Sequence, residues 1–176
     1  PDSFSPILMG IISSDPLSVS AYISLALGIL LLACSAFVSA SEVAYFSLEP
    51  QDLDEIREKE TKASQNVLKL LETPQKLLAT ILIANNFVNV AIIILITYFS
   101  TKLFDFSQNP IMGFLVQSVI ITFLLLLFGE IIPKIFATQN AQKMALRAGG
   151  TLMGLQRLLS PFVFVLVKSS AIMPIE

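Results

Sequence analysis

The stretch that decides the fold is Phe128-Gly129-Glu130-Ile131-Ile132-Pro133-Lys134, which ends an apolar run long enough to cross a membrane. Pro133 has no N–H group, so in a helix the carbonyl of Gly129 loses its partner beside the Glu130 carboxylate. Irregular backbone and ionisable groups at membrane depth are found where they are buried in protein or line a cavity, and they commonly mark an ion path. The stretch therefore predicts a helical membrane protein with a cation site.

The composition supports a membrane setting. Hydrophobic residues make up 55% of the 176 residues and charged residues only 14%, which argues against a water-soluble domain. The sequence has no histidine and one cysteine, Cys34, which excludes an intrachain disulfide and a Cys/His zinc site. An intramembrane hydrolase would need a base and a nucleophile or a metal-held water, so we expect no enzyme activity.

Three apolar segments are expected to cross the membrane, at about residues 19–47, 77–99 and 111–136. Thr73 and Pro74 predict the start of the second segment, with Thr73 as the N-cap and proline at the first helical position. We therefore predict an all-α membrane domain with three transmembrane helices.

Two further helical regions are expected on the cytoplasmic side. Residues 50–72 are polar and begin with a proline at a helix start, so they predict a helix or a helix pair. In residues 141–170 basic side chains interrupt the apolar ones, and Pro161 is expected to bend the chain. This last region is interpreted as helices that lie in the inner interface or wrap around the spans.

The positions of the basic residues predict the orientation. No Lys or Arg precedes Arg57, and Lys102 alone lies between the second and third spans, whereas the other basic residues follow the first or the third span. By the positive-inside rule the N-terminus and the Lys102 connection are outside. Residues 1–18 are then an extracellular lead-in, residues 19–170 the transmembrane domain, and residues 171–176 the start of a linker toward cytoplasmic domains.

Each predicted crossing carries oxygen-bearing groups that helical spacing brings to one face. The groups are Ser35, Ser39 and Glu42 in the first crossing, Asn85 and Asn89 in the second, and Gly129 and Glu130 in the third. Hydroxyl, amide, carbonyl and carboxylate oxygens are ligands for hard cations, and magnesium and sodium both suit this set. A single carboxylate leaves binding weak enough for release, as a carrier requires.

Structural alternatives remain open for the neutral groups. Ser35 and Ser41 are expected to bond mainly to their own backbone, as serines in spanning helices commonly do. The pair Asn85 and Asn89 suits helix packing through amide hydrogen bonds as well as it suits ion binding.

Alternatives remain open for the charged groups too. Glu130 and Lys134 have the favourable i, i+4 order for neutralising each other. Glu42 is expected to be interfacial or salt-bridged rather than a ligand. The basic residues between positions 143 and 168 are most simply contacts to lipid headgroups.

Three motifs in order give the sequence a family resemblance. They are Phe37-Val38-Ser39-Ala40-Ser41-Glu42, Ala84-Asn85-Asn86-Phe87-Val88-Asn89 and Gly129-Glu130-Ile131-Ile132-Pro133-Lys134. They resemble the signatures of the transmembrane domain shared by bacterial CorC, archaeal CorB and the cyclin M (CNNM) proteins. Ala84 stands where the family commonly has glycine, which leaves the choice between the two asparagines open.

The resemblance implies a magnesium transporter. It implies a homodimer of subunits with three spanning helices and a juxtamembrane belt helix at about 141–170, exporting Mg²⁺ from the cytoplasm with Na⁺ as counter-ion. Carried over from the family, the dehydrated ion would be held by Ser39, by Asn89 with Asn85 as its neighbour, and by Gly129 and Glu130.

The resemblance also implies partners and a location. The protein would be a multi-pass protein of the cell inner (plasma) membrane, in contact with the lipid bilayer and without a nucleic-acid partner. Nucleotide would bind only through paired cytoplasmic CBS modules that this sequence does not include. The alternative is a membrane scaffold or assembly partner without transport activity, in which the polar residues serve helix packing.

Overall fold

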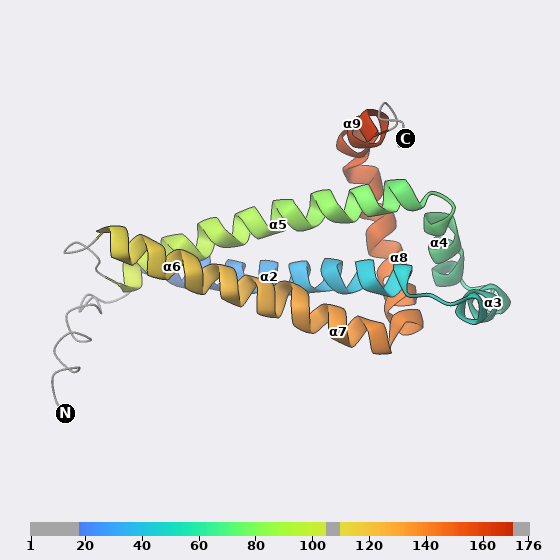
Figure 1. The fold of residues 1–176 in the computed structure, drawn as a ribbon, viewed down its shortest axis with the longest axis horizontal. Helices are drawn as coiled ribbons and strands as arrows, with labels where there is room; N and C mark the ends of the chain where they lie inside the picture. The colour runs from blue at the N-terminus through green and yellow to red at the C-terminus, as the bar shows by residue number, and fades with distance from the viewer. Residues whose placement is uncertain (1–17, 105–109, 171–176) are drawn as a thin grey trace, which may run out of the picture.

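The computed structural model describes residues 18–104 and 110–170, and its regular elements are helices (Figure 1). Residues 1–17 of the predicted lead-in, residues 105–109 of the predicted external connection, and the predicted linker at 171–176 lie outside the described residues.

Three long helices of the described chain are apolar enough to cross a membrane, as predicted. They are α2 (Val19–Phe46), α5 (Pro74–Leu103), and the continuous segment Pro110–Gln139, which comprises α6 (Pro110–Leu124), the π-helix η1 (Leu125–Ile131) and α7 (Ile132–Gln139). Their 28, 30 and 30 residues correspond to about 42–45 Å, more than the roughly 30 Å of hydrocarbon in a bilayer. Helix α2 packs against α5 and also against η1 and α7, so it is the common partner of the other two spans.

The start of α5 differs in one detail from the expectation. Pro74 is the first helical residue, as predicted, and Thr73 occupies the N-cap position. However, the Thr73 side chain makes no capping hydrogen bond, because its backbone (φ −130°, ψ 68°) lies outside the extended region that such a bond requires. The fixed φ of the proline therefore sets this helix start.

The polar segment after α2 is a helix pair. The two helices are α3 (Pro50–Glu58) and α4 (Lys62–Leu71). Before α3, the Glu49 N–H donates to the Asp52 carboxylate at 3.0 Å, and before α4 the Ser64 N–H donates to the Thr61 hydroxyl at 3.1 Å. Glu60 separates the helices with a left-handed backbone (φ 45°), so two capped helices form rather than one.

The last two helices are α8 (Ala141–Leu158) and α9 (Ser160–Ser170), which meet at an angle of 78°. Figure 1 shows α8 running crosswise to the long helices, at the end where α3 and α4 also lie. The predicted bend is present, but it lies at Leu159 rather than at Pro161. Proline is the second residue of α9, where its missing N–H costs no helical hydrogen bond, so it begins a helix instead of kinking one.

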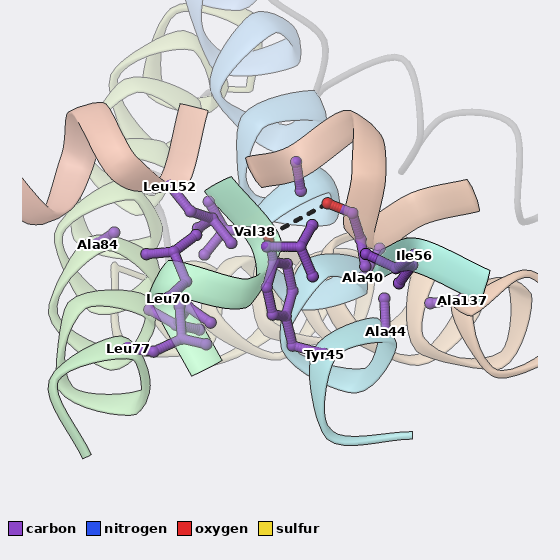
Figure 2. Close-up of a cluster of buried hydrophobic side chains, with 14 residues drawn as sticks. Val38, Ala40, Ala44, Tyr45, Ile56, Leu70, Leu77, Ala84, Ala137 and Leu152 are labelled. Atoms are coloured by element: carbon purple, nitrogen blue, oxygen red, sulfur yellow. Dashed lines mark hydrogen bonds between the residues drawn. The ribbon is translucent and has the colours of Figure 1, made fainter. Parts of the chain in front are cut away.

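The apolar core lies where α2, α4, α5 and α8 meet (Figure 2). Tyr45 is almost fully buried in it and donates its hydroxyl to the Ala145 carbonyl at 3.2 Å. Gly149 allows this close approach, since a Cβ there would lie 3.2 Å from the Tyr45 hydroxyl oxygen. In contrast, the spans leave large side chains such as Phe87 and Phe114 about 70% exposed, as expected for helices that face lipid. The core therefore holds the crosswise helices to one end of the spans.

Candidate cation site

The third span widens into a π-helix at the stretch that opened the sequence. The Ile132 N–H donates to the Leu127 carbonyl, five residues back, instead of to the carbonyl four residues back. Pro133 has no N–H, so it can serve neither the Phe128 carbonyl at π spacing nor the Gly129 carbonyl at α spacing. The predicted break is therefore a wider turn within a continuous helix that runs on to Gln139.

Ser35 lies at the centre of a group of oxygen atoms between α2 and α5. Its Oγ is 3.0 Å from Oδ1 of Asn85 and 2.7 Å from Oδ1 of Asn89, while Oγ of Ser39 is 3.4 Å from the same Asn85 oxygen. Both serines are fully buried. The three contacts share two hydroxyl protons, because each serine has one, so the Ser35 proton is divided between two asparagine oxygens. The cluster therefore has more acceptor oxygens than hydroxyl protons.

The third span joins this cluster through two neighbouring residues. The Asn89 side-chain amide donates to Oε1 of Glu130 at 3.2 Å. Gly129 is buried against α2, and a Cβ at this position would lie 3.3 Å from Oγ of Ser35. The π-helix thus brings its glycine and its carboxylate to the polar junction on successive residues.

All five residues predicted as ligands therefore lie at one junction of the three spans. They are Ser39, Asn85, Asn89, Gly129 and Glu130. Within the part of the chain that the structure describes, no group of three or more His, Cys, Asp or Glu residues could hold a metal. An ion at this junction would thus be bound mainly by neutral oxygens and one carboxylate.

Two of the predicted alternatives for the serines can be compared with the structure. Ser41 donates to the carbonyl of Phe37 at 2.6 Å, so its expected bond to its own backbone is confirmed. The same expectation for Ser35 is wrong, because its hydroxyl contacts the side chains of Asn85 and Asn89 instead. The spacing of the serines indicated this contact with the asparagines, since Ser35 lies one turn before Ser39 on the same face of the helix.

The structure decides between the alternatives that were open for the charged residues near the junction. Lys134 does not pair with Glu130, four residues earlier, but with Glu42, with its Nζ 3.1 Å from Oε2. The expected salt-bridged state of Glu42 is thereby confirmed. Glu130 instead accepts a hydrogen bond from Asn89 in the polar cluster.

The spans and their junction define a class of protein: a polytopic α-helical membrane protein with an oxygen-lined site between its helices. The sequence matches the Cyclin M transmembrane N-terminal domain family over residues 26–174. The chain therefore belongs to this family, as its three motifs predicted.

Curated relatives agree with this assignment. The chain is 32% identical over 138 residues to a UPF0053 protein of Haemophilus influenzae, and 30% identical over 132 residues to the UPF0053 inner membrane protein YfjD of Escherichia coli. It is 32% identical over 131 residues to metal transporter cnnm-4 of Caenorhabditis elegans. These alignments cover 78%, 75% and 72% of the chain, but only 32%, 30% and 27% of the relatives. The chain thus spans about a third of their length or less.

Proposed function

We propose that this domain transports magnesium across the membrane, through a dehydrated-ion site between its three spans. The observation that carries the proposal is the oxygen cluster around Ser35, where three oxygen–oxygen contacts share two hydroxyl protons. A cation would relieve this crowding, because hydroxyl protons could then turn away and leave the lone pairs to the ion. The nematode relative is named as a metal transporter, which supports the same class of activity.

The donor set of the junction suits Mg²⁺ among hard cations. Magnesium binds oxygen ligands at roughly 2.1 Å in a near-octahedral arrangement and is usually held by one or two carboxylates. The junction offers hydroxyl, amide and carbonyl oxygens with a single carboxylate. Ca²⁺ takes more oxygen ligands, and often several carboxylates. We therefore take Ser39, Asn85, Asn89, Gly129 and Glu130 as the ligand set, with Ser35 as the residue that positions the asparagines.

The proposed orientation in the membrane rests on the distribution of the basic residues between the two ends of the spans. Helices α3, α4 and α8, with most of the basic residues, lie at one end of the spans, and Lys102 lies near the end of α5 at the other (Figure 1). The positive-inside rule assigns the first end to the cytoplasm and the N-terminus to the outside of an inner (plasma) membrane. On this assignment α8 and α9 form the cytoplasmic belt. Efflux of Mg²⁺ in exchange for Na⁺, by a homodimer, is the cycle that we propose.

Binding is tested by isothermal titration of the purified protein with MgCl₂. Glu130→Gln and Asn89→Ala should each weaken binding at least tenfold, because the first removes the only carboxylate of the cluster and the second removes an amide that contacts Ser35 and Glu130. Asn86→Ala is the matched control on the same helix, since this side chain lies on an exposed neighbouring face. Equal affinity in the wild type and in both site variants would refute the proposed site.

Transport is tested in proteoliposomes with a fluorescent magnesium indicator. Wild type should move Mg²⁺ faster with an opposing Na⁺ gradient, and Ser39→Ala should reduce the flux, whereas Ser41→Ala should not. Ser41 is a suitable control because its hydroxyl bonds only to its own helix. Binding that depends on Glu130, combined with no flux in any condition, would instead indicate a membrane scaffold that uses the junction for assembly.

A further inference from the structure

A pocket of about 300 Å³ lies between the start of α5 and the hinge of α8 and α9, away from the polar junction. Its polar wall comprises Lys76 of α5, Gln156 near the end of α8, Ser160 at the start of α9, and Lys168 of α9. Its apolar wall comprises three residues of α9, which are Val163, Phe164 and Val167. The 78° bend between α8 and α9 brings these two walls together.

The polar wall is rich in hydrogen-bond donors that lack an acceptor among the described residues. The side-chain Nε2 of Gln156 is buried and has no hydrogen-bond partner among the described residues. Neither Lys76 nor Lys168 has an ion-pair partner in the described part of the chain, and the Nζ of Lys168 lies 5.8 Å from the centre of the Phe164 ring. The first turn of α9, at Ser160, adds the positive end of a helix dipole. A buried donor without a partner is destabilising, so an occupant with anionic oxygens fits this wall.

The apolar wall narrows the choice of anion. Phe164 and Val165 of α9 are about two thirds exposed, so the pocket opens onto a surface suited to hydrocarbon. Its position beside the first turn of α5 places it near the end of a membrane span, at headgroup depth. A small soluble anion would use the lysines but not this surface. A phospholipid would use both.

We propose that this pocket binds the phosphodiester headgroup of an anionic phospholipid, with its acyl chains along α9. The phosphate oxygens accept from Lys76, Lys168 and the Gln156 amide, and Phe164 contacts the hydrocarbon next to the headgroup. This lipid would tie the hinge of α8 and α9 to the start of α5. The proposal is independent of ion transport, because it uses none of the residues of the polar junction.

Native mass spectrometry of the detergent-purified protein tests the proposal, with phosphatidylglycerol and phosphatidylcholine of identical acyl chains. We expect tighter binding of phosphatidylglycerol, weakened about 30-fold by the double variant Lys76→Gln/Lys168→Gln, since each lysine near a membrane surface contributes roughly fivefold. Lys62→Gln/Lys69→Gln removes two lysines of α4, which do not line the pocket, and is the matched control. Gln156→Leu should also weaken binding.

Competition identifies the source of the phosphate group. Millimolar inorganic phosphate should leave bound phosphatidylglycerol in place, because it cannot use the apolar wall. Displacement by inorganic phosphate would overturn the proposal in favour of a soluble anion. Equal affinity for the two lipids, or equal loss in the pocket and control variants, would also overturn it. Thermal unfolding without lipid distinguishes a variant that misfolds from one that only loses the lipid.

Discussion

Lys134 forms its ion pair with Glu42 of another span and not with Glu130 of its own, with Nζ 3.1 Å from Oε2. The pair joins α7 to α2 one helical turn beyond the polar junction. Because the lysine is directed away from Glu130, the carboxylate remains available to Asn89 and to an ion. The separation of these two charged groups is thus part of how the site is built.

The ion pair itself should contribute little to stability. Its side chains are 37% and 32% exposed, so a double-mutant cycle with Lys134→Gln and Glu42→Gln should give a coupling energy below about 1 kcal/mol. Thermal unfolding in detergent measures it. The cycle of Lys134→Gln with Glu130→Gln is the comparison and should show weaker coupling. Stronger coupling to Glu130 would contradict the observed pairing.

Ser35→Ala should disturb the proposed cation site, although Ser35 is not one of the proposed ligands. The change removes the oxygen that lies between Asn85 and Asn89, so both amides lose their common partner. We expect Mg²⁺ affinity to fall roughly tenfold, as for residues that orient metal ligands, and unfolding stability to fall by about 0.6–1.7 kcal/mol. Ser41→Ala is the control. If the two variants titrate identically, Ser35 is not a positioning residue.

Gly129→Ala should weaken the junction sterically. The new Cβ would lie 3.3 Å from Oγ of Ser35 and 3.4 Å from Cδ1 of Leu32, so these side chains must shift by a few tenths of an ångström. Gly154→Ala is the control, since a Cβ there meets nothing within 4 Å and should stabilise α8 by roughly 0.5–1 kcal/mol. Melting temperature and Mg²⁺ affinity are the readouts. Equal melting shifts would contradict the close packing.

Tyr45→Phe tests how firmly α8 is held to α2. The variant keeps the ring in the core and removes the hydrogen bond to Ala145, leaving a buried carbonyl with one partner fewer. We expect a loss of about 0.5–1.5 kcal/mol in the free energy of unfolding. Tyr22→Phe is the control, since Tyr22 is 57% exposed, and it should leave the free energy of unfolding unchanged. A Tyr45 variant as stable as wild type would mean that packing alone holds the crosswise helix.

The sequence predicted the three spans well, because length and hydropathy determine membrane crossing almost without help from tertiary structure. It predicted a helix or a helix pair after α2 from Pro50 and the acidic residues that follow it. It misplaced the bend before α9, because proline is compatible both with a kink and with a helix start, and local sequence does not separate the two. The same ambiguity hid the π-helix, where the backbone accommodates Pro133 by a wider turn.

Ser35 shows why the site could be predicted only in part. Its spacing from Ser39 indicated a shared face, yet nothing in one helix says which face meets the asparagines of another. Only the packing of α2 against α5 makes Ser35 the contact of both amides. Likewise, the partner of Lys134 could not be chosen between an acid on its own helix and one on α2 until the helices were assembled.

The sparse packing of α6 has a consequence for the site. Only Gly113 and Ile121 of this helix are buried, so the rest of the chain makes few contacts with it. Its position in a membrane therefore depends mainly on the surrounding lipid. A hydrophobic segment that does not match the local bilayer thickness changes its tilt. Since α6 continues directly into η1, such tilting would displace Glu130 and alter its distance from Asn89. If the junction binds a cation as proposed, acyl-chain length is a physical variable that tunes its affinity.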